Sequence, residues 1–200
     1  MAISLTKGQK ISLKKEDGSS LSSFCVGANW GAINEKGFFG TKTKAVDLDL
    51  SVVLINDTKQ VCDVVYFGKT SAKGIKHSGD DRTGDVGGDD GLDNEIISID
   101  LNNLENGVSQ IFFVLNSYTH IEFDKIPFAS IRLYEGTPTR VNKVFAQYNV
   151  ANDASFQGRE AMILAKLYKK DGEWKFSAIG EATRDKKLEE LISNSIPNYI

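Results

Sequence analysis

Acidic side chains and glycines are concentrated in one stretch of this 200-residue chain, from His77 to Glu95. Between Asp80 and Glu95 there are seven acidic residues and one arginine, which gives this segment a net charge of −6. The net charge of the whole chain is −3, so the remaining residues together carry +3. Like charges packed into one folded loop repel one another unless a cation neutralises them. The composition therefore predicts a cation-binding loop, and its negative charge argues against nucleic acid as a partner.

Calcium fits this loop better than other metals. Calcium accepts about six to eight oxygen ligands from carboxylates, carbonyls and water, whereas magnesium requires a stricter octahedron. Zinc prefers His or Cys, and His77 is the one such residue in the stretch. The loop is not an EF-hand, because Val86 stands where that motif needs glycine and Leu92 where it needs glutamate. The alternative to an ion site is a flexible, solvated acidic loop.

A second acidic pair, Asp47 and Asp49, flanks Leu48. In a strand the two aspartates share one face, and the apolar side chains of Leu48, Leu50, Val52 and Leu54 occupy the other. We expect the apolar face in the core and both carboxylates at the start of the strand, where they could complete a site with the acidic loop and the Leu48 carbonyl. The alternative is a solvated pair of edge carboxylates.

Short runs of β-branched and aromatic residues separated by turn residues predict an all-β fold, a two-sheet antiparallel β-sandwich of about ten strands in a single domain, residues 1–200. A single closed sheet satisfies the same pattern. The expected strands are Lys10–Lys14, Ser22–Gly27, Asp47–Ile55, Val61–Phe67, Ile96–Leu101, Gln110–Asn116, Phe128–Tyr134, Lys143–Asn149, Met162–Tyr168 and Trp174–Ile179. The last two read as a hairpin because Asp171-Gly172 is a pair favoured in tight hairpin turns.

A short helix is expected at the C-terminus, from Asp185 to Ser195. Its apolar stripe of Leu188, Leu191, Ile192 and Ile196 has helical spacing, and Pro197 is expected to end it. We expect this helix to pack on the sandwich, and a partner-binding helix is the alternative.

Several features favour the cytosol. The apolar runs, such as Ile111–Leu115, fall well short of the about 20 residues that cross a bilayer, so no transmembrane segment is expected. The opening Met1–Lys7 lacks the apolar stretch of a secretory signal. Cys25 and Cys62 each lie in a strand-like run and are expected to be reduced core residues.

The sequence resembles the TerD family of tellurium-resistance and general stress proteins over nearly its whole length. The segments that carry the resemblance are Ile3–Gln9, Val26–Trp30, Val46–Asp49, Gly79–Gly84, Leu167–Lys170, Gly172–Phe176 and Ala178–Gly180. Gly31 departs from the family pattern, which has Asp after this tryptophan, and Glu181–Arg184 replaces a glycine-rich stretch, so a divergent paralogue is expected.

The resemblance implies a calcium-binding β-sandwich, with two Ca²⁺ ions held between the Asp-Leu-Asp strand and the acidic loop. Carried onto this chain, the ligands are Asp47, Leu48, Asp49, Asp80, Asp81, Thr83, Asp85, Asp89, Asp90 and Glu95, with Asp93 and Glu95 as alternatives at the closing position. It also implies a bacterial cytoplasmic role in resistance to tellurite and chemical stress, without established catalysis. The implied partners are other stress-resistance proteins of the TerD and TerC group at the inner membrane, to which this protein would be peripheral.

Three functions are therefore open. The leading hypothesis is a non-enzymatic calcium-binding stress protein whose ion-loaded surface recruits partners. The second is a hydrolase that uses the same carboxylates around a magnesium pair, although His77 and His120 are the only histidines. The third is a calcium-dependent module for glycans or lipid head groups, in which Trp30 and Tyr118 could stack against a sugar.

Overall fold

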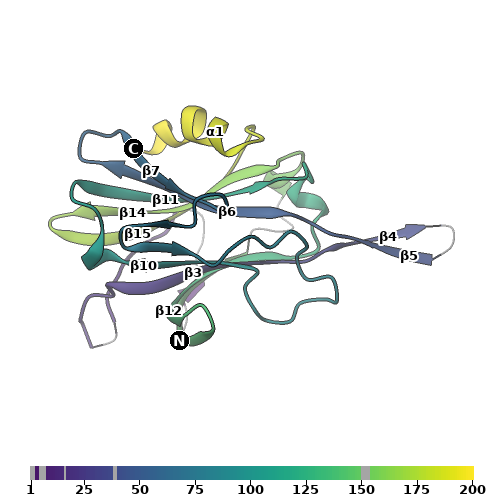
Figure 1. Ribbon diagram of the computed structural model, residues 1–200, viewed down its shortest axis with the longest axis horizontal. Coiled ribbons are helices and arrows are strands. Elements are labelled where there is room, and N and C mark those ends of the chain that lie inside the picture. Colours follow the sequence, from purple (N-terminus) through teal and green to yellow (C-terminus); the bar gives the residue numbers. More distant parts are fainter. Residues whose placement is uncertain (1–2, 5–7, 16, 38–39, 150–153) are drawn as a thin grey trace.

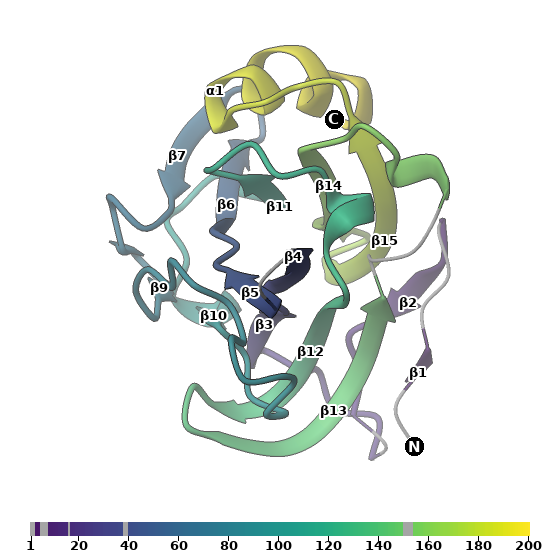
Figure 2. The ribbon, with the colours of Figure 1, turned by 90° about the vertical axis from the view of Figure 1, so that its right-hand side faces the viewer.

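The computed structural model describes residues 3–4, 8–15, 17–37, 40–149 and 154–200, and these form a two-sheet β-sandwich (Figures 1 and 2). The first sheet has the strand order β1 (Ile3–Ser4), β13 (Arg140–Asn149), β12 (Ala129–Thr137), β3 (Ser23–Trp30), β10 (Glu95–Asp100), β9 (Ile75–His77) and β8 (Ser71–Ala72). The second has the order β2 (Lys10–Ser12), β15 (Glu173–Thr183), β14 (Ala161–Lys170), β11 (Val108–Ser117), β6 (Leu48–Asn56) and β7 (Val61–Val65). Among these described strands the pairing is antiparallel, except that β1 runs parallel to β13.

The main core lies between the two sheets and follows from the period of two along each strand. In β3 the side chains of Phe24, Val26, Ala28 and Trp30 point inward, and in β6 those of Leu48, Leu50, Val52 and Leu54 do so. Residues between them in sequence face outward. This alternation confirms the expected core face of β6 and leaves Asp47 and Asp49 on its other side.

A helical segment at the C-terminus covers the outer face of the second sheet (Figures 1 and 2). It consists of α1 (Leu188–Glu190), a π-helical turn η4 (Leu191–Ser195) and a 3₁₀ turn η5 (Ile196–Tyr199). Leu191 and Ile196 are fully buried against Val53, Phe112 and other outward-facing residues of the sheet. The helix therefore packs on the sandwich, as expected.

The predicted bounds of this helix are wrong at both ends. The helix begins at Leu188, so Asp185 lies outside it. The Asp185 carboxylate accepts hydrogen bonds from Ser195 Oγ and, at 3.0 Å, from Asn194 Nδ2 in the helical segment. Pro197 lies within the final 3₁₀ turn and does not end the helix. Proline is tolerated in the first positions of a helical turn, because an N–H there has no partner within the turn.

Each of the ten expected strands corresponds to a strand of the structure, with ends that differ by a few residues. The expected hairpin between β14 and β15 turns at Asp171 and Gly172, whose φ angles of 54° and 77° are both positive, as its turn type requires. Among the described residues five short strands were not predicted: β1, β8, β9 and the ribbon of β4 (Ile33–Gly37) and β5 (Gly40–Lys44), which projects from the sandwich (Figure 1). None of these has an alternating apolar pattern.

The two cysteines differ in burial. Cys25 is buried on β3, as predicted. The prediction for Cys62 is wrong, because this thiol is exposed on β7, the outermost strand of the second sheet. No helix in the described part of the chain is long and apolar enough to span a bilayer.

We expect Leu191→Ala to lower the free energy of unfolding by about 2–5 kcal/mol, because it leaves a cavity between the helical segment and the second sheet. Urea denaturation followed by circular dichroism measures this change. Leu92→Ala is the matched control, since that side chain is 66% exposed and its loss should change stability by less than about 0.5 kcal/mol. Equal effects of the two substitutions would show that the helical segment does not contribute to the folded core.

Candidate metal centre

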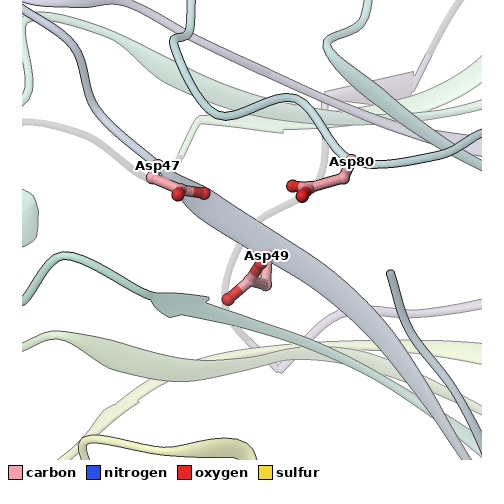
Figure 3. A group of neighbouring side chains, drawn as sticks. All are labelled: Asp47, Asp49 and Asp80. Carbon is pink, nitrogen blue, oxygen red and sulfur yellow. The ribbon is translucent and has the colours of Figure 1, made fainter. Parts of the chain in front are cut away.

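Three carboxylates from two segments meet beside the start of β6 (Figure 3). Asp47 directly precedes the strand, Asp49 is its second residue, and Asp80 follows β9 at the beginning of the acidic loop. One oxygen from each lies within 4.8 Å of the others, and Figure 3 shows the side chains of Asp47 and Asp80 pointing toward one another. The expectation that the Asp-Leu-Asp strand and the acidic loop share a site thus has a geometric basis.

The two aspartates at the start of β6 are buried and incompletely hydrogen-bonded. Asp47 is 6% exposed and Asp49 3%, so the alternative of a solvated pair is wrong. Asp49 Oδ2 accepts a hydrogen bond of 2.9 Å from Asn116 Nδ2. Asp47 Oδ2 has Arg82 Nε at 3.9 Å, and its buried Oδ1 has no hydrogen-bond partner among the described residues. A buried carboxylate oxygen without a partner is destabilising unless a ligand satisfies it.

Burial and mutual repulsion raise the pKa values of this pair. The pKa of Asp47 rises to about 6, mainly through burial and then through the charge of Asp80. The pKa of Asp49 rises to about 7, mainly through burial and then through the charge of Glu95. A bound cation would favour the ionised form of both groups and compete with protons for them.

Glu95 supports the site through hydrogen bonds to the backbone, and its carboxylate is not one of the three that meet there. This fully buried carboxylate accepts the Leu50 N–H on Oε2 at 2.7 Å and the Asp81 N–H on Oε1 at 3.2 Å. His77 Nε2 lies 3.4 Å from Glu95 Oε2 and 2.9 Å from the Leu50 carbonyl oxygen, while Nδ1 accepts the Gly79 N–H. Burial raises the pKa of Glu95 despite these bonds. The pair joins β6, β9, β10 and the acidic loop.

Most other carboxylates of the loop are engaged by neighbouring backbone amides. Asp81 Oδ1 accepts from the N–H groups of Thr83 at 2.8 Å and Gly84 at 3.0 Å, and from Thr83 Oγ1 at 3.0 Å. Asp89 and Asp90 each accept the N–H two residues ahead, the Asx-turn pattern. These bonds give carboxylate oxygens of the loop hydrogen-bond partners without a metal. The loop carboxylates are therefore chemically unlike Asp47 and Asp49.

Asn94 is the polar centre of the loop. Its Nδ2 donates to Asp85 Oδ1 at 3.0 Å and to Asp81 Oδ2 at 3.4 Å, and its Oδ1 accepts the Trp30 N–H at 2.7 Å. Gly84, with φ of +63°, lies against the Trp30 ring, where an added Cβ would be 2.6 Å from a ring carbon. The loop and β3 are thus held together by one amide side chain and one close approach.

The end of the loop is fixed to the outer face of the first sheet. Arg132 of β12 pairs with Asp93 at 2.8 Å, and Asp93 lies over Gly27, where any Cβ would collide with its carboxylate. Asn29 Nδ2 donates to Asp89 Oδ1 at 3.0 Å. Asp93 is therefore bonded to an arginine, which makes it a poor candidate for the closing ligand.

The eleven candidate ligands fall into several groups in space. Asp47, Asp49 and Asp80 form one group, and the Leu48 side chain lies in the core. Thr83 is bonded to Asp81, and Glu95 braces β6. Asp81, Asp85, Asp89, Asp90 and Asp93 line a separate, open hollow of about 690 Å³. The three-aspartate group is the one within the described residues that brings a possible ligand atom from each member close enough for a single ion, so the two-ion arrangement stays a prediction.

Sequence reasoning did not find several residues that shape the site. His77 was considered from the sequence only for zinc binding and for hydrolysis. It and Asn94 lie in the acidic stretch and could have been considered as hydrogen-bond partners of its carboxylates. Asn116 and Arg132 had no local signal, because each meets its carboxylate from a strand that is distant in sequence. Trp30, considered above for sugar stacking, is fully buried and donates from Nε1 to the Val46 carbonyl at 2.8 Å, so that role is wrong.

The residues present fit a hard cation. Every donor in the group is a carboxylate oxygen, one buried oxygen has no partner, and mutual repulsion between the carboxylates would be relieved by positive charge. Soft metals that prefer nitrogen or sulfur are disfavoured, because both ring nitrogens of the neighbouring His77 are engaged by backbone groups.

Residues 1–194 match the family model for the TerD domain. The chain belongs to the TerD domain family. Stress response protein SCP2 of Bacillus subtilis (strain 168) is 34% identical, with 98% of this chain and all of that protein covered. Tellurium resistance protein TerZ of Serratia marcescens is 30% identical over 99% of both chains. A crystal structure of a homologue of telluride resistance protein TerD from Streptomyces coelicolor A3(2) matches 86% of this TerD-domain chain and 95% of its own, with a TM-score of 0.63 and 18% identity, which supports the fold.

The raised pKa values of Asp47 and Asp49 make stability depend on pH when no divalent cation is bound. In unfolded chains aspartate titrates near pH ~3.9. Between roughly pH 4 and pH 7 the folded protein therefore holds more protons than the unfolded chain, and the free energy of unfolding falls as pH rises through this window. In EDTA we expect a higher urea midpoint at about pH 5 than at about pH 7.5.

Asp49→Asn removes one charge and should flatten this pH dependence, with a gain in stability near pH 7.5 on the order of 1–2 kcal/mol after solvent screening. Asp171→Asn is the matched control, because Asp171 is exposed in a turn that asparagine tolerates equally well. If Asp49→Asn kept the wild-type dependence on pH, the buried pair would not be its source.

Proposed function

We propose that this protein is a calcium-binding stress-response protein of the tellurite-resistance type, which acts as a non-enzymatic, ion-dependent interaction module. The observation that carries the proposal is the buried Asp47 Oδ1, which has no partner among the described residues and lies beside Asp49 and Asp80. A Ca²⁺ ion there would be held by these three carboxylates, and the Leu48 carbonyl and water would supply further oxygens. The ion would neutralise the charge that burial otherwise penalises.

Calcium is preferred over magnesium because of the form of the group. The two buried carboxylates lie two residues apart at the start of β6, and the third, Asp80, is exposed on a loop. Ligands on elements of such different rigidity suit the flexible coordination of Ca²⁺ better than the strict octahedron of Mg²⁺. The second ion of the proposal would occupy the hollow lined by Asp85, Asp89 and Asp90.

The proposed role is recruitment and not catalysis. His77, the histidine nearest the carboxylates, has one ring nitrogen bonded to the Gly79 N–H and the other to the Leu50 carbonyl, so it is not free to act as a general base. Val86 and Leu92 expose 52% and 66% of their surface on the acidic loop. Apolar side chains next to an ion site offer a contact surface whose charge changes when the ion binds.

The names of the relatives support the biological setting of the proposal. Relatives that match almost their full length are named tellurium resistance and stress response proteins. We place this protein in the bacterial cytoplasm, where its partners would be other stress-resistance proteins of the TerD and TerC group at the inner membrane. Its contribution would be a surface that is complete only with calcium bound.

Isothermal titration calorimetry with CaCl₂ should show saturable binding. At about 100 times Kd, the ion should stabilise the folded state by about 2.7 kcal/mol. For a chain of this size that raises the Tm by roughly 5–10 °C. Replacing both Asp47 and Asp49 by Asn should weaken calcium binding roughly 100-fold, because two charge-assisted ligands are lost.

Asp171→Asn serves as the control and should bind calcium as the wild type does. The double variant should remain folded in EDTA, since it removes buried charge, so lost binding would not reflect unfolding. Wild-type protein that gives neither heat nor a rise in Tm with calcium would refute the proposal. Tighter binding of magnesium than of calcium would reject the choice of ion.

A further inference from the structure

A pocket of about 470 Å³ lies on the outer face of the second sheet, next to Asp49 but separate from Asp47 and Asp80. Its floor is formed by β6 and β11, one wall by the segment that follows β7, and another by the residues that precede and begin α1. The helical segment covers the apolar part of this face (Figure 2). The volume falls within the about 300–1,000 Å³ typical of small-molecule sites.

The floor of this pocket carries two buried polar atoms without partners among the described residues. These are Ser51 Oγ, in a fully buried residue, and Asn116 Oδ1, in a residue that is 5% exposed. Val53 and Ile55, which follow on the same face of β6, pack under the helical segment instead. Buried polar groups in folded proteins are nearly always hydrogen-bonded, so two orphans on one pocket floor indicate that a ligand supplies their partners.

The wall of the pocket is aromatic. Tyr66 and Phe67 contact one another edge to face with ring centroids 5.3 Å apart, and Phe67 contacts Tyr118 in the same way at 5.9 Å. Tyr118 is 58% exposed, so its ring is available to a ligand at the rim. Aromatic rings in such a wall provide apolar surface against which the C–H groups of a ligand can pack.

The polar groups of the pocket define the chemistry of that ligand. The floor offers two acceptors, the Asn116 Oδ1 and the Asp49 carboxylate. It also offers the Ser51 hydroxyl, which can both donate and accept a hydrogen bond. In the lining, the positive charges of Lys186 and Lys187 offset the formal charges of Asp49 and Glu189, so the lining has no formal net charge. The complementary ligand is neutral, donates several hydrogen bonds and has an apolar face.

We propose that this pocket binds a neutral carbohydrate of one or two rings. Sugar hydroxyl groups donate to Asn116 Oδ1 and Asp49 and exchange a hydrogen bond with Ser51 Oγ, and the C–H face of the ring packs on Tyr118. The Asn116 side chain bonds to Asp49 through Nδ2 and offers Oδ1 to the ligand, which connects the pocket with the candidate ion. Only this connection rests on the proposed calcium site. The pocket itself does not.

Saturation-transfer difference NMR with glucose, galactose, mannose, N-acetylglucosamine and their common disaccharides tests the proposal on the full chain, followed by a titration of the best ligand. We expect saturable binding that Ser51→Ala and Tyr118→Ala each weaken roughly tenfold, as expected for one lost hydrogen bond or ring contact. Ser51→Ala should also keep or raise the Tm without sugar, because it removes an unsatisfied buried hydroxyl. A purely structural serine would lower it.

Ser109→Ala is the matched control, since this hydroxyl lies on β11 away from the pocket, and it should leave the affinity within about twofold. Absence of saturable binding to every sugar tested, or wild-type affinity in the Ser51 and Tyr118 variants, would overturn the proposal. Repeating the titration in EDTA separates the two sites. Sugar binding in a protein that does not bind calcium would refute the proposed function alone, and calcium binding without sugar binding would refute the pocket alone.

Discussion

The arrangement of this protein depends on the burial of ionisable carboxylates at the place where β6 meets the acidic loop. Glu95, on the first sheet, accepts hydrogen bonds from the backbone amides of Leu50 and Asp81 and pairs with His77. This brace holds the loop against β6 and brings Asp80 to Asp47 and Asp49. Both oxygens of Glu95 already have hydrogen-bond partners. The carboxylates that a cation would stabilise most are therefore the three aspartates. The fold thus separates a carboxylate that builds the site from carboxylates that are left for a ligand.

Contacts within the protein hold the acidic loop in place. Asx turns, the Asn94 amide and the Asp93–Arg132 pair engage most of its carboxylates within the protein. Packing of Gly84 on Trp30 and of Asp93 on Gly27 fixes the loop to the first sheet. A high density of negative charge in a sequence therefore does not by itself show how many ions a loop binds. The number depends on which oxygens the fold leaves unpaired.

The C-terminal helical segment has two structural consequences. It buries the apolar half of the outer face of the second sheet, and it ends that cover where β6 and β11 become polar. The uncovered part is the pocket beside Asp49. The solved homologue from Streptomyces coelicolor has a similar fold. Through Asn116, occupancy of the pocket and of the ion site would influence one another in this chain, since both act on the Asp49 carboxylate.

Features that depend on near neighbours could be predicted from the amino-acid pattern: the period of two that defines ten strands and the inward face of β6, the turn at Asp171 and Gly172, the acidic loop and the family. The pattern did not predict the five short strands, which lack that period, or the exposure of Cys62, which depends on β7 lying at a sheet edge. Nor could the sequence show which of the eleven candidate ligands are left for an ion and which are hydrogen-bonded to an amide or paired with an arginine. That division depends on which strands lie side by side, since Asp49 meets Asn116 and Asp93 meets Arg132 only after the sheets have formed. The alternation of apolar and polar residues along a strand indicates which side chains are buried. Hydrogen-bond partners that are distant in sequence depend on tertiary packing.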